Sequence, residues 1–370
     1  MKNICELLRE GLTNIGSINE VDWESTFSDA KKKCMSHEEV ADYLNKVVAN
    51  VDKKTKDREK FDAGLPYVHA KSRLLSKGSD GVDVDEFIKR ITKRPDNIIT
   101  FNSKMEKTGK AHEYVYNTGI PAFRGVVYDI EAGKFYVLNT CPGAGSCVAI
   151  CYARSGNYIR FSNSYDLMTR RINFMLNYPD KYAEQIYDEL KAKCIEHKAF
   201  IGYKNKVILR WNDSGDFFSK KYVSIAKSVM DRLTEDGYNI TSGVYTKVAS
   251  VANDGSNFDN VVFSSGANKG ETDKVDVYNS RNATVIPKAL LKGLNLMKLS
   301  DEQTLKGRVV NHFKNKDGSQ RFNIDDIITY DEMMDTNKSG SPRWHVIVTN
   351  QDGDDALHRP DVKTILLVQH

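Results

Sequence analysis

The chain has 370 residues, of which 40% are hydrophobic and 28% are charged, a composition typical of a globular protein. This composition excludes a wholly disordered or collagen-like chain, and no segment approaches the roughly 20 apolar residues of a membrane span. The net charge of +4 neither demonstrates nor opposes nucleic-acid binding. Met1–Gly16 lacks an apolar core of signal-peptide length, so we expect a cytoplasmic protein without a membrane partner.

Helical patterns dominate residues 1–95. Ser36 and Glu39 occupy the two reciprocal positions of a capping box, and apolar residues follow them at helical spacing. A second helix is predicted over Asp83–Lys93, with Pro95 just beyond it as a stop signal. We therefore expect residues 1–95 to form a helical N-terminal region.

Short strands appear from about residue 96, and beyond residue 205 they alternate with helices. The predicted strands are Asn97–Phe101, Glu113–Asn117, Gly125–Ile130, Lys134–Asn139, Lys206–Trp211, Asn239–Thr246, Asn260–Ser264, Ala283–Ile286, Trp344–Thr349 and Thr364–Val368. The predicted helices are Ser164–Tyr178, Pro179–Glu196 and a helix capped by Ser219. Such alternation favours a parallel sheet. We predict an α/β protein, with a partial (β/α) barrel over residues 96–290 and a small α+β extension over 291–370.

Three of the six cysteines fall within eleven residues. Cys141, Cys147 and Cys151 lie in the loop Thr140–Gly156, which reads TCPGAGSCVAICYARSG. Thiolates are soft, charged donors for zinc and iron, and the Pro and Gly residues suit a tight loop around a metal. The other three stand alone, which is typical of a reducing compartment rather than of a disulfide framework; they are Cys5, Cys34 and Cys194. We predict that the three loop cysteines hold one metal centre.

Two kinds of metal centre remain open for this loop. A structural zinc site normally has four protein ligands, so zinc would need Cys194 or a distant histidine as the fourth. An iron–sulfur cluster with three cysteine ligands keeps one iron open for a small molecule. We favour a 4Fe-4S cluster and keep zinc as the alternative.

Polar residues follow the strand Lys206–Trp211 at its carboxyl end, where the chemistry of parallel α/β sheets gathers. Asp213 and Asp216 could bind an amine or a metal, or act as acid and base. They could equally form a turn and a helix cap. Arg210 could pair with one of these carboxylates or with a ligand carboxylate. We assign Asp213 and Asp216 as candidate catalytic residues, and Ser214, Gly215 and Arg210 as candidate cofactor-binding residues.

Two further loops lie at the ends of the next predicted strands. Lys247 could attract a carboxylate or a phosphate, or it could be an ordinary exposed lysine. Ser265 belongs to a Ser- and Gly-rich loop, residues 264–270, that suits a backbone anion nest. We add Lys247 and Ser265 to the candidate cofactor-binding residues.

An acidic segment near the C-terminus reads Asp352-Gly353-Asp354-Asp355, with His345, His358 and His370 around it. These side chains could bind a divalent ion, although the spacing does not match an EF-hand loop. Alternatively, the segment is an acidic turn between two strands. It could also close over the mouth of the barrel.

Basic and aromatic residues follow the cysteine loop, a combination that suits phosphate contact and base stacking. The basic residues are Arg154, Arg160, Arg170 and Arg171, and the aromatic residues are Tyr152, Tyr158 and Phe161. Arg170 and Arg171 also fit the solvated face of a helix. These residues favour a nucleotide or nucleic acid as a partner.

Three segments resemble the bacteriophage family called gene product 88: CPGAGSCVAICYA, RWNDSGDFFSKKY and GVYTK, within about residues 97–280. More distantly they resemble radical S-adenosylmethionine enzymes. In those enzymes, three cysteines after the first barrel strand hold a four-iron cluster. S-adenosylmethionine chelates the open iron through its amino and carboxylate groups. A motif at the end of the next strand contacts the amine of S-adenosylmethionine. The resemblance implies Cys141, Cys147 and Cys151 as cluster ligands and residues 213–216 as the second motif. Both gaps between the cysteines are longer here than in that superfamily.

Three functions follow as hypotheses. The first is an iron–sulfur enzyme of radical type that uses S-adenosylmethionine and modifies a nucleotide or a nucleic-acid base. If a phage encodes the chain, this enzyme would act in the host cytoplasm. The second is a zinc-containing hydrolase or base-exchange enzyme that uses Asp213 and Asp216, because DSGD resembles the DSGG turn of guanine transglycosylases. The third is a zinc-stapled binding module without catalysis.

Overall fold

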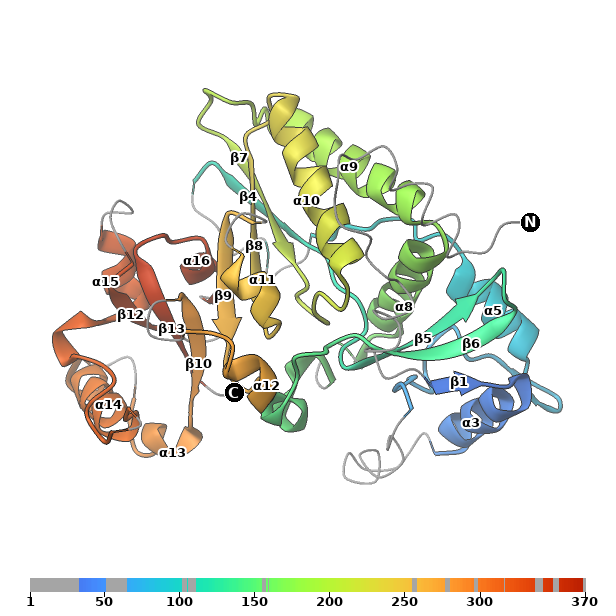
Figure 1. Cartoon of the computed structure of the whole chain (residues 1–370), viewed down its shortest axis with the longest axis horizontal. Coiled ribbons are helices and arrows are strands. Elements are labelled where there is room, and N and C mark those ends of the chain that lie inside the picture. Colours follow the sequence, from blue (N-terminus) through green and yellow to red (C-terminus); the bar gives the residue numbers. More distant parts are fainter. Residues whose placement is uncertain are drawn as a thin grey trace.

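The computed structural model describes residues 33–50, 65–101, 105, 111–154, 158, 160–254, 258–276, 280–295, 299–315, 317–336, 342–348 and 353–368. Cys5, Asp352 and His370 therefore lie outside the described residues. Figure 1 shows a large sheet covered by helices beside a smaller sheet formed by earlier parts of the chain. Among the described helices, none combines the length and apolar character that crossing a bilayer requires.

The large sheet is parallel. Its described strands are β4 (Glu113–Asn117), β7 (Lys206–Trp211), β8 (Ile240–Thr246), β9 (Asn260–Ser264), β10 (Asn282–Ile286), β11 (Ile327–Thr329), β12 (Trp344–Val348) and β13 (Val362–Val368). They lie in the order β11-β12-β13-β10-β9-β8-β7-β4, and every neighbouring pair runs parallel. In the described chain the sheet is open, with β4 and β11 at its edges. The predicted α/β class and the partial-barrel arrangement are confirmed.

The strand order reverses direction once. From β4 to β10 the chain adds strands in sequence, but β11 then lies at the far edge and the chain returns through β12 to place β13 beside β10. Crossovers between parallel strands are right-handed, so a reversal moves the connecting helices to the opposite face. One face packs against α9 (Pro179–Glu196), α10 (Lys220–Glu235), α11 (Ala249–Asn253) and α14 (Leu299–His312), and the other packs against α15 (Tyr330–Asp335) and α16 (Gly353–Leu357).

Strand β8 shows how the sequence builds two buried faces. Val244 lies in the core cluster that contains the apolar residues of α10, whereas Tyr245 packs in the cluster of α16. Gly243 also faces α16, and a Cβ atom there would lie 2.6 Å from Cε1 of His358. Only glycine allows α16 to approach β8 this closely, because the missing side chain leaves the space that His358 occupies.

The smaller sheet is antiparallel and has the order β1-β6-β5 among the described strands. Its strands are β1 (Lys33–Met35), β5 (Arg124–Asp129) and β6 (Lys134–Asn139). It packs against α3 (His37–Ala49), α5 (Val84–Thr92) and α8 (Ser162–Asn177). The capping box of Ser36 and Glu39 is confirmed at the start of α3. Residues 33–95 thus contain two helices together with β1, β2 (Lys77–Gly78) and β3 (Gly81–Val82) in the described part of the chain.

The strand predicted over Asn97–Phe101 does not form a ladder. Only Thr100 pairs with β4, as an isolated bridge to Asn117. The backbone N–H groups of Ile98 and Ile99 instead donate to the carboxylate of Glu189 at 2.8–2.9 Å. A charged side chain has taken the hydrogen bonds that a neighbouring strand would otherwise supply, and the hydrophobic pattern of the segment does not reveal this competition.

The packing of α16 on β8 predicts opposite effects for two glycine substitutions. Gly243→Ala should lower the free energy of unfolding by about 1–3 kcal/mol, because the methyl group overpacks His358 and Leu357. Gly307 in α14 has no atom within 4 Å of an added Cβ, so Gly307→Ala should raise stability by about 0.5–1 kcal/mol. Chemical denaturation of both variants measures the difference. Equal stability of Gly243→Ala and wild type would contradict this packing.

Candidate functional site

The three-cysteine loop lies at the carboxyl end of the parallel sheet. It leaves β6 and contains two short 3-10 helices, η1 (Ser146–Ile150) and η2 (Tyr152–Arg154). The backbone N–H groups of Gly145 and Cys147 both donate to the carbonyl of Gly266, at 2.9 and 3.2 Å. The N–H of Asn268 donates back to the carbonyl of Gly143 at 2.8 Å. The loop is therefore held against the segment between β9 and α12 (Lys269–Thr272), which it meets near the middle of Figure 1.

This close approach of two backbones requires glycine. A Cβ atom on Gly145 would lie 2.6 Å from the carbonyl oxygen of Ala267, and one on Gly143 would overlap the carbonyl of Lys247. Both contacts involve backbone atoms, which cannot move aside as a flexible side chain can. The glycines of the cysteine motif therefore allow the loop to contact the ends of β8 and β9 directly.

The cysteine thiols share one environment. Cys141 Sγ accepts a hydrogen bond from the N–H of Phe123 at 3.2 Å. Burial raises the pKa of Cys141 to about 12; the charges of Asp216 and Cys151 add to this rise, and Lys247 opposes it. Burial also raises the pKa of Cys151, where Cys147 adds to the rise and Lys247 again opposes it. The three thiols and the Lys247 ammonium group are thus close enough to influence one another electrostatically.

The donor chemistry fits a thiophilic metal, but the described thiols do not converge on one point. Among the described residues, no three His, Cys, Asp or Glu side chains are arranged to hold a metal ion. Binding would require the three sulfurs to turn toward a common centre. Cys194 does not join them: it is fully buried in the core near the end of α9, which leads to the amino end of β7, at the opposite end of the sheet.

Asp213 connects the cysteine loop to two strands. Its carboxylate accepts hydrogen bonds from Tyr158 OH at 2.8 Å and from Asn117 Nδ2 at the end of β4. Its backbone carbonyl accepts a hydrogen bond from Tyr152 OH, and Tyr152 directly follows Cys151. The interactions of Asp213 therefore fix Tyr152 of the loop and Tyr158, just beyond it, relative to the sheet.

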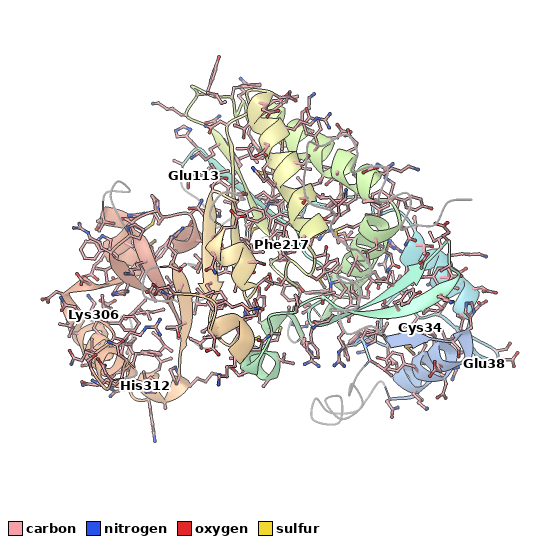
Figure 2. All side chains as sticks on the ribbon, in the orientation of Figure 1. Cys34, Glu38, Glu113, Phe217, Lys306 and His312 are labelled. Carbon is pink, nitrogen blue, oxygen red and sulfur yellow. The ribbon has the colours of Figure 1, made fainter. Side chains whose placement is uncertain are left out.

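Asp216 connects the loop after β7 to the loop after β8. Its buried carboxylate accepts hydrogen bonds from Thr246 Oγ1 and from the N–H groups of Lys247 and Phe217, each at 2.8 Å. Burial raises the pKa of this carboxyl. The cap of α10 is Ser219 rather than Asp216. Phe217, labelled in Figure 2, marks this junction near the middle of the molecule.

The cysteine loop and the segments that follow β7, β8 and β9 all lie within one family match. The family model described as Gene product 88 matches residues 97–326. The chain belongs to the gene product 88 family. No curated protein and no solved structure matches it. The family match covers all three loop cysteines and the polar ends of β7, β8 and β9, but it ends before α16.

Helix α16, beyond the family match, supplies the counterion of Arg210. Asp354 forms an ion pair with Arg210 in which both side chains are buried, at 2% and 6% exposure. Tyr245 lies beside this pair: the Arg210 guanidinium is 5.1 Å from its ring centroid, and its hydroxyl donates to the carbonyl of Gly353. The acidic C-terminal segment therefore closes against the sheet. Asp355 accepts a hydrogen bond from Tyr330 OH at 2.7 Å.

The remaining predicted site residues differ in what they contact. Lys247 Nζ donates to Ser264 Oγ at 3.1 Å. Ser265 donates its N–H to the carbonyl of Ala283 at 2.7 Å, which is a contact between β9 and β10. Ser214 is buried and its carbonyl accepts from Ile120, while Gly215 adopts a positive φ of 79°. Of this group, only Lys247 brings a charged side chain to the thiols.

Several residues that shape the site escaped the sequence prediction. Asn117 is visible in the sequence only as the last residue of a predicted strand, and Asp354 only as part of an acidic segment. Arg171, which the sequence placed among the basic residues of the loop, is buried and donates to the carbonyl of Gly119 at 3.3 Å. Arg170 donates to the carbonyl of Arg90 at 3.1 Å. Both arginines therefore stabilise the scaffold.

The contacts of Asp216 predict a stability effect. Asp216→Asn should lower the free energy of unfolding by about 1–3 kcal/mol. Thr246 and Lys247 donate to different carboxylate oxygens, and the amide nitrogen that replaces one of these oxygens cannot accept a hydrogen bond. Asp231→Asn is the matched control, because Asp231 forms an exposed ion pair with Lys227 whose loss should leave stability unchanged. Thermal and chemical denaturation measure both. An unchanged Asp216→Asn protein would show that this carboxylate does not hold the two loops together.

Proposed function

We propose that this chain is an iron–sulfur enzyme of radical type, with Cys141, Cys147 and Cys151 as the ligands of a 4Fe-4S cluster. The observation that carries the proposal is the position of the three thiols on a loop fixed by backbone hydrogen bonds at the carboxyl end of a parallel sheet. When bound, a cluster with three protein ligands supplies one-electron chemistry at an open iron, here toward S-adenosylmethionine. The resemblance of the cysteine loop to that enzyme superfamily supports the proposal.

The surrounding residues have supporting roles in this proposal. Lys247 places a positive charge beside the thiols, which offsets the negative charge that deprotonated cysteines bring to a cluster. Asp213 and Asp216 fix the positions of the loops, and Arg210 holds α16. The isolated thiols and the cluster both favour a reducing cytoplasm as the location.

Among the contacts of the described residues, none specifically favours the alternative functions. A hydrolase or base-exchange enzyme would require Asp213 and Asp216 to act on substrate, but both carboxylates accept hydrogen bonds from the protein. A zinc site completed by Cys194 would need a thiol that is buried near the opposite end of the sheet. The iron–sulfur proposal needs neither condition.

Metal content tests the proposal. Protein purified without oxygen should be brown and should contain iron and sulfide close to the four of each that a 4Fe-4S cluster holds. Alanine substitution of Cys141, Cys147 or Cys151 should each remove the iron, because each thiolate is a ligand. Cys34→Ala is the matched control, since Cys34 is exposed on β1, on the small sheet (Figure 2), and its loss should leave the iron content unchanged.

Two results would contradict the iron–sulfur proposal. One is a colourless anaerobic protein with a single tightly bound zinc ion. The other is full retention of iron after removal of any one loop cysteine. Loss of the metal in Cys194→Ala, with that variant still folded, would instead indicate a four-thiolate site.

A further inference from the structure

Three large apolar side chains in and just after the cysteine loop are exposed. Ile150, Tyr152 and Phe161 are each 54% exposed, and they lie within twelve residues of chain. A single exposed apolar side chain is ordinary in a folded protein. Three of them around a candidate site, two of them aromatic and one directly after Cys151, indicate a surface that receives a ligand.

The exposed ring of Tyr152 is held in place. Its hydroxyl donates to the backbone carbonyl of Asp213, and its ring makes an edge contact with Tyr158 at 5.6 Å between centroids. Tyr158 is itself anchored, because its hydroxyl donates to the Asp213 carboxylate at 2.8 Å. An anchored aromatic ring loses little conformational entropy when a planar group stacks on it. Tyr152 is therefore a preorganised stacking surface beside the cysteine loop.

The chain segment that carries these side chains has basic residues and no acidic ones. The sequence has no acidic residue between Glu131 and Asp166, whereas it has Arg154 and Arg160 within the same stretch. The segments at the carboxyl ends of β4, β8 and β9 also lack acidic residues; they are residues 117–124, 246–253 and 264–270. The Asp213 and Asp354 carboxylates and the Arg210 guanidinium group also act on Tyr152. Asp213 accepts a hydrogen bond from Tyr158, and Asp354 is paired with Arg210.

Aromatic and basic groups also interleave at the base of the loop. The guanidinium group of Arg154 lies 5.5 Å from the ring centroid of Phe123, and that of Arg124 lies 4.5 Å from the same centroid. A guanidinium group carries five N–H donors in a planar fork that matches phosphate oxygens, and one nitrogen of Arg154 also donates to the carbonyl of Val148 at 3.4 Å. The surface thus combines flat apolar rings with positive charge, which is the complement of a base attached to a phosphate.

We propose that the loop platform, defined as Ile150, Tyr152, Arg154, Arg160 and Phe161, binds a single-stranded nucleic acid. Bases stack on Tyr152 and Phe161, and the phosphates contact Arg154 and Arg160. A single strand fits better than a duplex because a ring face can stack only on a base that has left its own stack. This inference rests on the proposed function, since it makes the strand the substrate of the centre held by the neighbouring cysteines.

Fluorescence anisotropy with the full-length protein tests the inference, using a labelled thymidine DNA strand and a uridine RNA strand of about 12 nucleotides, a typical site size. Both strands are compared with a duplex of the same length. Tyr152→Ala should weaken single-strand binding by roughly 5- to 100-fold, the loss of one stacked base. Tyr203→Ala is the matched control: Tyr203 is 67% exposed but precedes β7 at the opposite end of the sheet, and its loss should change nothing.

Two further variants separate stacking from folding and from charge. Tyr152→Phe keeps the ring but loses the anchor to Asp213, so it should bind between wild type and Tyr152→Ala. Arg160 is exposed, so the Arg160→Gln variant should fold normally. A plot of log affinity against log salt concentration should be less steep for this variant, by about 0.7 in slope, because one phosphate contact is lost. A preference for DNA or for RNA identifies the natural strand, and either preference supports the proposal.

The same measurement on Cys141→Ala keeps the two proposals apart. That variant should lose iron but still bind the strand, so failure of the cluster and failure of the platform give different results. The platform proposal is overturned if wild type binds neither strand, if it binds duplex as tightly as single strands, or if folded Tyr152→Ala binds as tightly as wild type.

Discussion

The site depends on the contact between the cysteine loop and the segment after β9. The Gly266 carbonyl accepts two N–H groups of the loop, from Gly145 and Cys147, and the Asn268 N–H returns a third hydrogen bond to Gly143. The segment that carries the thiols is thereby attached to the end of a buried parallel strand instead of lying free in solvent. Because the contact joins backbone to backbone, the glycines on the loop side are part of the site as much as the cysteines are.

Three polar connections extend this attachment across the sheet; Asp216 and the Arg210–Asp354 pair are buried, and Asp213 is half-buried. Asp213 joins β4 to the tyrosines of the cysteine loop, Asp216 joins the loops after β7 and β8, and Arg210 joins β7 to α16 through Asp354. Buried charged groups are costly unless they are paired or hydrogen-bonded, and each of these groups has such a partner. Asp213 and Asp216, which the sequence suggests as catalytic residues, thus position the loops that surround the thiols.

Much of the fold could be predicted because local patterns determine it. The helix Pro179–Glu196 and the strands Lys206–Trp211 and Asn260–Ser264 form with the predicted bounds, since their apolar periodicity agrees with the burial they receive. The strand predicted over Asn97–Phe101 failed because its N–H groups bond to Glu189, which is some 90 residues away in the chain.

The candidate site was predictable only in part. The sequence located the three cysteines and the polar strand ends, because spacing and composition mark them. It could not show that Asp354 neutralises Arg210, since their pairing depends on a return of the chain from the far edge of the sheet. Nor could it separate the buried Arg171 from the exposed Arg160, because both follow the same loop and only tertiary packing distinguishes them.

We propose that Cys141, Cys147 and Cys151 together bind one iron–sulfur cluster at the carboxyl end of the parallel sheet. Anomalous diffraction at the iron absorption edge, from crystals grown without oxygen, tests it most directly. We expect one cluster-sized iron peak in which each of the three cysteine sulfurs lies within bonding distance of an iron atom, with Lys247 beside it. A zinc peak with four protein ligands, or an iron peak that contacts fewer than three of these cysteines, would contradict it.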